Sequence, residues 1–252
     1  MNALPLLPDD LAQLIKFVPS RGWDALEWRP LLTQLRSISV QLATRRGVAG
    51  LATSVARETT AVSLAPAPKD SKRFEALNSR QHRAAGDRIL HFYFAQFRNG
   101  DGIFLDLRPA RFAWQRGRLH YSPTGLHGQL SPGFREGMMD LYRGFYLPDE
   151  KLLDDAMLRL GFLYEGQPED EAATLRRLLR DHFGGSMTAQ RFSIDEFKAS
   201  FDTLFGFFID NDYRLQTDFV LLGFYLITLY LSLDRLGTRH DVRAICLEEL
   251  KA

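Results

Sequence analysis

The stretch of residues 102–136 has residue types and a spacing that could carry chemistry. Asp106 follows a short apolar run, residues 103–105, and precedes Pro109, so one carboxylate lies on a loop of restricted conformation. A second apolar run ends in Gln-Arg-Gly-Arg, residues 115–118, which predicts a β-hairpin turn next to that loop. Kinases hold their catalytic base and their metal ligands on a rigid loop of this kind.

Three short motifs follow one another in this part of the chain: FLDLRPARF at residues 104–112, SPT at 122–124 and LSPGFRE at 130–136. In this order they resemble the H-A-D-P-H-P-G-N loop, the D-F-G motif and the L-S-P-x-x-R-E helix start of the AarF/UbiB family, whose members are atypical and protein-kinase-like. Flanking segments at 88–104 and 213–236 resemble two helices of the same C-terminal lobe. The resemblance covers about residues 75–250 and rests on ordered matches rather than on one motif.

The resemblance implies a role for three positions, and the chain departs from the family at two of them. Asp106 lies where the family has its catalytic Asp, which implies a base or a substrate-positioning carboxylate. Arg111 replaces the Asn that would bind magnesium, and Ser122 replaces the Asp of D-F-G. Magnesium requires oxygen ligands in a near-octahedral arrangement, and phosphoryl transfer depends on the metal for charge neutralisation. We therefore expect Asp106 to be an inactive remnant.

The degenerate metal positions would then be filled by the chain itself. We expect Arg111 to take the vacant cation position by pairing with Asp106. The rest of the predicted loop and hairpin site consists of Arg108, Pro109 and Thr124. We expect neither a metal nor another cofactor, because the six histidines show no metal-ligand spacing.

The first 85 residues lack the features of a nucleotide-binding lobe. Such a lobe needs a β-sheet, a flexible loop over the phosphates and a strand Lys paired with a helix Glu. No alternating strand pattern occurs there, and the nearest approach to a glycine-rich loop, GVAG at residues 47–50, lies inside a helical pattern. We expect the nucleotide lobe to be absent or reduced, with a helical N-terminal extension and linker over 1–70 and a kinase-like C-lobe domain over 71–252.

Composition is that of an ordinary globular protein. The 252 residues are 45% hydrophobic and 25% charged, with a net charge of +1, which gives no indication of a nucleic-acid partner. A single cysteine, Cys246, excludes an intramolecular disulfide and favours a reducing compartment. Together with the lack of a signal-peptide pattern, this predicts a cytoplasmic location.

The elements that must position the site are helical. The most apolar segment, residues 219–233, is shorter than the roughly 20 residues that a membrane span requires, so we expect a buried central helix. We expect no transmembrane segment, while a peripheral membrane contact stays open. The central helix is predicted over residues 215–236. Further helices are predicted at residues 9–17, 30–58 with interruptions at Gly47 and Gly50, 71–99, 131–146, 149–161, 168–183, 193–210 and 242–250, with Ser131, Asp149 and Ser193 as N-caps.

The predicted fold is mainly α (α+β), a protein-kinase-like C-lobe helical bundle with a small β-hairpin. The predicted function is that of a catalytically inactive pseudokinase module that binds or regulates, with a protein partner or a second copy of itself. The resemblance implies a link to ubiquinone or other isoprenoid lipid metabolism. Two alternatives stay open: a nonstandard ATP-dependent phosphotransferase that uses Asp106, and a purely structural helical subunit of an oligomer.

Overall fold

The computed structural model describes residues 37, 40, 44–183, 189–213 and 216–250, and the fold of this part is mainly α, as predicted. Its eight α-helices are α3 Val48–Glu58, α4 Ser79–Gln96, α5 Pro132–Tyr146, α6 Glu150–Arg159, α7 Glu169–Phe183, α8 Ile194–Asp210, α9 Asp218–Leu236 and α10 Val242–Glu249. Its strands are β1 Ile103–Phe104, β2 Phe112–Gln115, β3 Arg118–Tyr121, β4 His127–Gly128, β5 Gln190–Arg191 and β6 Arg239–His240. The strands form three two-stranded antiparallel pairs, β1 with β4, β2 with β3 and β5 with β6. Two single turns of 3-10 helix, η2 Phe74–Ala76 and η3 Pro109–Arg111, precede α4 and β2.

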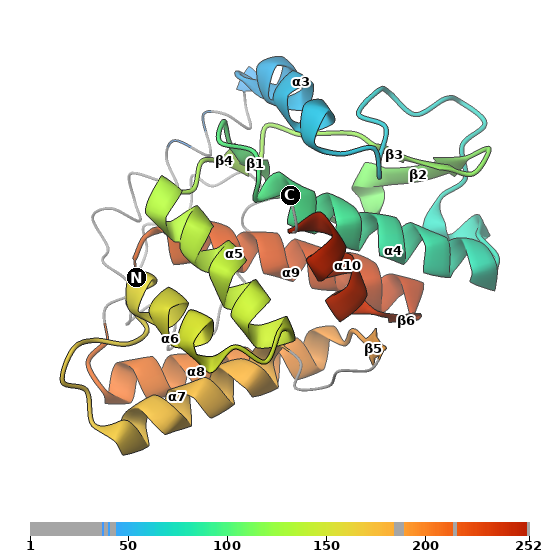
Figure 1. Cartoon of the computed structure of the whole chain (residues 1–252). Helices are drawn as coiled ribbons and strands as arrows, with labels where there is room; N and C mark the ends of the chain where they lie inside the picture. Colours follow the sequence, from blue (N-terminus) through green and yellow to red (C-terminus); the bar gives the residue numbers. More distant parts are fainter. Residues whose placement is uncertain (1–36, 38–39, 41–43, 184–188, 214–215, 251–252) are drawn as a thin grey trace, which may run out of the picture.

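The central helix is α9, and α4 runs beside it across the middle of the molecule (Figure 1). Twelve residues of α9 are buried. Among the described helices, α9 alone is long and apolar enough to cross a membrane, but most of it is buried inside the protein. Its apolar composition therefore reflects its position in the core, as the sequence predicts.

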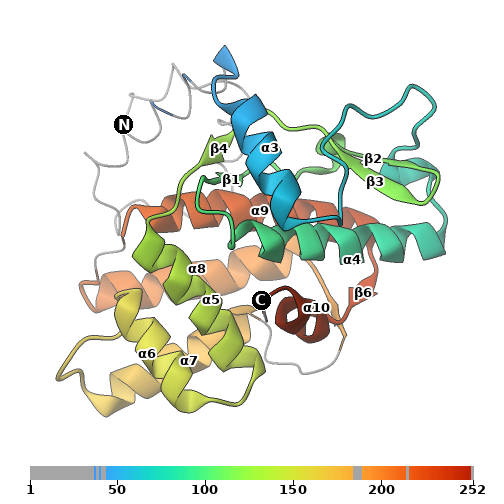
Figure 2. The same cartoon turned by 45° about the horizontal axis from the view of Figure 1, so that its top comes forward.

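The other helices cover this centre on two sides. The hairpin β2–β3 and α3 lie on one side, with α3 crossing over α4, and α5 to α8 lie on the other (Figures 1 and 2). On the second side α5 packs against α6 and α7 packs against α8, while α10 contacts both α4 and α5. One hydrophobic core connects these layers and includes Val48, Leu51 and Val55 of α3. The domain boundary between residues 70 and 71 stays a prediction.

The hairpin forms where the sequence predicts it. Phe112 pairs with Tyr121 at its base, and the two residues of its turn, Arg116 and Gly117, both have positive φ, +47° and +78°. This conformation is that of a type I′ turn, whose twist matches that of the strands. Both edges of the hairpin are covered, because Ser63 pairs beside β3 and Lys72 pairs beside β2.

Two helix starts differ from the predicted positions. The pattern predicts a helix from residue 71, but α4 begins at Ser79 because Asn78 and Gln81 form a reciprocal capping box. The predicted helix at 215–236 also starts later, since α9 begins at Asp218. In the predicted helix at 30–58 the expected interruption at Gly47 is present: α3 begins at Val48, directly after Gly47 in the left-handed conformation (φ +81°). The predicted helix at 9–17 lies outside the described residues.

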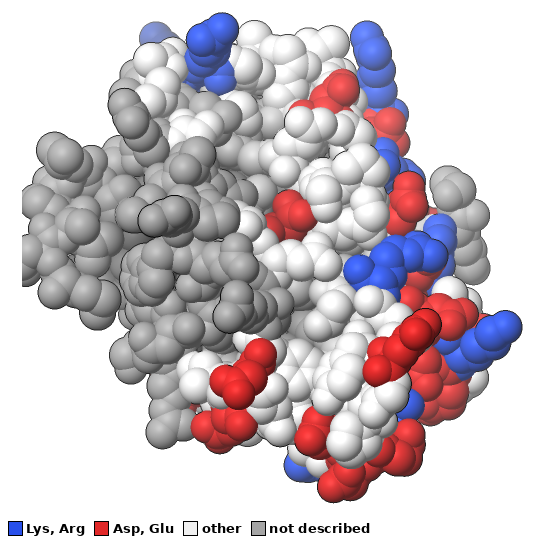
Figure 3. All heavy atoms as spheres, turned by 90° about the vertical axis from the view of Figure 1, so that its left-hand side faces the viewer, with Lys and Arg blue, Asp and Glu red and all other residues white. Residues whose placement is uncertain are grey.

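Charge is distributed unevenly over the molecule. Residues 44–121 contain more than twice as many Lys and Arg as Asp and Glu, whereas in residues 149–213 acidic residues are twice as numerous as basic ones. The acidic side chains gather over the lower part of the face in Figure 3, where α7 and α8 lie. The net charge of +1 therefore results from two regions of opposite sign.

Candidate functional site

Asp106 lies in the loop after β1, and its backbone is fixed from two sides. The leucines that flank it are fully buried, and their carbonyl oxygens accept hydrogen bonds from Thr228 and Ser232 of α9. The hydroxyl of Tyr121 in β3 donates a hydrogen bond of 2.9 Å to the carbonyl oxygen of Asp106. The central helix and the hairpin thus hold the loop in one conformation.

The carboxylate of Asp106 has no exposed surface and is surrounded by cations and a hydroxyl. Arg108 binds both of its oxygens, with Nε 2.6 Å from Oδ1 and Nη2 2.8 Å from Oδ2. Nε of Arg111 lies 3.2 Å from Oδ2, and the hydroxyl of Thr124 lies 3.4 Å from the same oxygen. Such a bidentate guanidinium–carboxylate pair is among the strongest charge-assisted arrangements in proteins.

The expected pairing of Arg111 with Asp106 is present, but Arg108 forms the tighter pair. Although Nε of Arg111 is within ion-pair distance, it is buried without a properly oriented hydrogen-bond partner. The contact between Arg111 and Asp106 is therefore a charge interaction with poor hydrogen-bond geometry. Arg108 therefore supplies the internal cation that was expected from Arg111.

The remaining predicted residues join the same cluster. Pro109 opens the 3-10 turn that brings the chain back to β2, and its ring favours the extended backbone of Arg108 (φ −63°, ψ 154°). The backbone N–H of Ser122 donates to the carbonyl oxygen of Arg111 at 2.8 Å, one step beyond the last pair of the hairpin. Arg111 and Ser122 are therefore direct neighbours across the base of the hairpin.

Two further arginines support this cluster and were not expected. Arg73 donates to the carbonyl oxygens of Ala110 and Phe112, at 3.0 and 2.9 Å. Nη2 of Arg45 donates to the carbonyl oxygen of Pro123 at 3.1 Å. Both contacts join segments far apart in the sequence, which a local pattern does not reveal.

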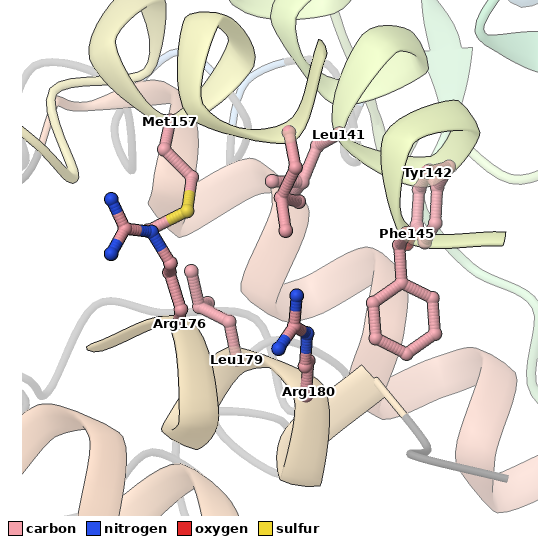
Figure 4. A pocket seen from close by; sticks show the side chains of 8 residues that line it. Leu141, Tyr142, Phe145, Met157, Arg176, Leu179 and Arg180 are labelled. Atoms are coloured by element: carbon pink, nitrogen blue, oxygen red, sulfur yellow. The ribbon is translucent and has the colours of Figure 1, made fainter. Parts of the chain in front are cut away.

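Three small cavities between the helices lie away from the cluster around Asp106. The first, of about 10 Å³, lies between α5, α6 and α7, with Leu141, Met157, Leu179 and Arg176 among the side chains around it (Figure 4). Arg176 forms an ion pair with Asp154, so its charge is already balanced and does not favour an anion in this hollow. A volume of this size holds about one water molecule.

Two other hollows, of about 30 Å³ each, have mostly apolar walls, and none of the three is lined by Asp106 or its neighbours. Among residues 44–183, 189–213 and 216–250, no group of three His, Cys, Asp or Glu side chains converges in a way that could hold a metal ion. Asp106 therefore has arginines around it rather than other acids.

The chain was also compared with known proteins. No protein-family model matches it, and no curated protein matches it significantly. The resemblance to the AarF/UbiB family therefore stays a hypothesis that rests on the ordered motifs.

Proposed function

We propose that this chain is a catalytically inactive, kinase-like module whose function is to bind a protein partner. One observation carries the proposal: the carboxylate of Asp106 is completely buried and binds Arg108 through both oxygens. In the AarF/UbiB family, which this chain resembles, this position supplies the catalytic Asp. A base must reach the substrate hydroxyl, and a metal ligand must offer a free oxygen, so the pairing with Arg108 opposes both roles.

Energetics support the same view. Removing one partner of a buried ion pair costs about 3–5 kcal/mol, because the other charge is left uncompensated. A metal ion or substrate that displaced Arg108 from Asp106 would meet a penalty of that order. The pair of Asp106 and Arg108 therefore has a structural role: it connects the loop after β1 to the start of η3.

The resemblance suggests where the partner is to be sought. Proteins of ubiquinone and other isoprenoid lipid metabolism are the first candidates, and a second copy of this chain is another. The proposed location is the cytoplasm. Neither a nucleic-acid partner nor a cofactor belongs to this proposal.

Thermal unfolding with ATP or ADP, each with and without magnesium, tests the lack of catalysis. A ligand that binds only the folded state raises the Tm, so the wild-type chain should show no shift under any of these conditions. The variant R108H/R111N/S122D restores the family residues at three positions and is the matched control. We expect this variant to gain a shift that requires magnesium.

The contrary result would be a magnesium-dependent shift of the wild-type chain that Asp106→Asn abolishes. It would favour the phosphotransferase that uses Asp106. Light scattering of the purified chain and pull-down from cell extract address the other alternative, because a purely structural subunit should form a stable oligomer and capture no other protein.

A further inference from the structure

The loop around Asp106 contains more positive charge than the carboxylate neutralises. Arg108 already satisfies both carboxylate oxygens, so the pairing of Arg111 adds a second guanidinium to the same anion. Arg45 adds a third cation nearby through its bond to Pro123. Asp106 is the one acidic side chain among the described residues within 4.0 Å of Arg111. A charge surplus therefore exists at Arg111.

Arg111 is also the member of the cluster that can serve an external ligand. Its side chain is 27% exposed, whereas the Asp106 side chain has no exposed surface. Its Nε is buried and faces Asp106, so an external ligand would meet the two terminal nitrogens of the guanidinium, for which no hydrogen bond to a described residue is formed. The hydroxyl of Ser122, directly across the hairpin base, is half-buried and makes no hydrogen bond to a described residue.

We propose that Arg111 and Ser122 form a metal-independent site for the phosphate group of a phosphorylated side chain on a protein partner. The guanidinium fork matches two phosphate oxygens, and the serine hydroxyl can donate to a third. A phosphate carries close to two negative charges at neutral pH, which suits the guanidinium of Arg111 with Arg45 nearby. The site depends on the proposed function, because it requires Asp106 to stay paired with Arg108.

The surroundings favour a phosphate at the surface of a protein over one that belongs to a nucleotide. A nucleoside needs a cavity for its base, and of the three hollows that described residues line, none reaches Arg111 or Ser122. The basic region of residues 44–121 contains Arg111 and ends directly before Ser122. It would attract an acidic partner and orient the acidic helices α7 and α8 away from that partner.

Calorimetric titration in the presence of EDTA tests the site, with inorganic phosphate and N-acetyl-phosphoserine amide as the probes. We expect both probes to bind at millimolar concentration without metal. Arg111→Gln should weaken binding about tenfold or more, the effect of one lost charge-assisted hydrogen bond. Arg111→Lys keeps the charge but loses the fork, so it should fall between wild type and Arg111→Gln.

Two more variants keep the test decisive. Ser122→Asp places a carboxylate opposite Arg111 and should abolish phosphate binding even if Arg111→Gln does not fold. Arg177→Gln removes an arginine of α7 that is 65% exposed and should leave binding unchanged.

The phosphate site is overturned if neither probe binds, or if binding is insensitive to both Arg111→Gln and Ser122→Asp; the proposed function would survive that result. Metal-free ADP binding that is tenfold tighter than phosphoserine binding would overturn the assignment to a protein partner. ATP binding that requires magnesium would instead overturn the proposed function itself.

Discussion

Arg108 and Arg111 contact the same carboxylate, that of Asp106, but they differ in geometry and exposure. Arg108 is bidentate and only 13% exposed, while Arg111 makes one misaligned contact and is more open to water. A buried carboxylate without a partner is costly, whereas a partly solvated pair contributes little. The two arginines should therefore differ in their contribution to stability.

Replacing each arginine by alanine measures this difference. Arg108→Ala should lower the free energy of unfolding by about 3 kcal/mol or more, because Asp106 loses the partner of both oxygens. Arg111→Ala should lower it by about 1 kcal/mol or less. Urea unfolding of both variants gives the two values directly. A larger loss for Arg111→Ala would contradict the division of roles proposed for the site.

The sequence predicts that Asp106 pairs with an arginine, and it also contains a signal for Arg108 as the dominant partner. Arg108 lies two residues after Asp106, and Pro109 favours an extended backbone before it, so the two side chains share one side of the chain. The family motif instead predicts Arg111, because this residue lies at the metal-binding position of that motif. The contacts of Arg45 and Arg73 link distant segments, and no local rule predicts them.

At the scale of elements, close contact between helices sets narrow limits on side-chain size. A Cβ added to Gly144 of α5 would lie 2.6 Å from the backbone nitrogen of Leu153 in α6. A Cβ added to Gly223 of α9 would meet only the ring edge of Phe201, at 4.0 Å, and Gly223 borders one of the apolar hollows. The same substitution should therefore have opposite effects at the two positions.

Glycine-to-alanine substitution tests this close packing. Gly144→Ala should destabilise the protein by about 1–3 kcal/mol, because α5 and α6 must move apart. Gly223→Ala should stabilise it by up to about 1 kcal/mol, the gain in helix propensity, with a small addition from filling the hollow. Thermal and urea unfolding measure both. Loss of stability in Gly223→Ala would show that the space beside Phe201 is not available.

Helix ends separate what the sequence can predict from what it cannot. Asp149 and Ser193 are predicted caps, and each accepts a hydrogen bond from a backbone N–H three residues later. Ser131, predicted on the same grounds, makes no capping bond and instead donates its hydroxyl hydrogen to Asp218 at 2.7 Å. Caps follow local rules, whereas Asp218 is 87 residues away and meets Ser131 only after α5 and α9 have packed.

At the scale of the whole molecule, one ionic cluster joins helices from the two ends of the described chain. Arg98, after α4, pairs with Glu58 of α3 and Glu249 of α10, and His91 of α4 lies 2.8 Å from the same Glu249. The hydrogen bond that His91 donates to the carboxylate of Glu249 raises the pKa of His91 above 6.5, although partial burial opposes this shift. Partial burial favours a higher pKa for Glu249, but the bonds from His91 and Arg98 outweigh it and lower the pKa.

A second histidine has the opposite shift. Complete burial lowers the pKa of His182 from 6.5 to about 4, and its Nδ1 lies 2.9 Å from the hydroxyl of Ser200. A folded-state pKa below the unfolded value means that the unfolded chain takes up the proton first as the pH falls. Stability supplied by neutral His182 is therefore present above pH 6.5 and is lost as the pH falls toward 4.

The two histidines together predict a stability maximum close to neutral pH. The contribution of His91 is complete below pH 6.5 and is lost as the pH rises through its raised pKa, while that of Glu249 is present above 4.5 and lost on acidification. Urea unfolding between about pH 5 and pH 8 should therefore give a bell-shaped curve. His182→Gln should flatten its acid limb, and His91→Gln should flatten its alkaline limb, because each variant removes one titrating group. If the alkaline limb persists in His91→Gln, or if His182→Gln flattens the alkaline limb instead, the link between α4 and α10 does not control the loss of stability at high pH.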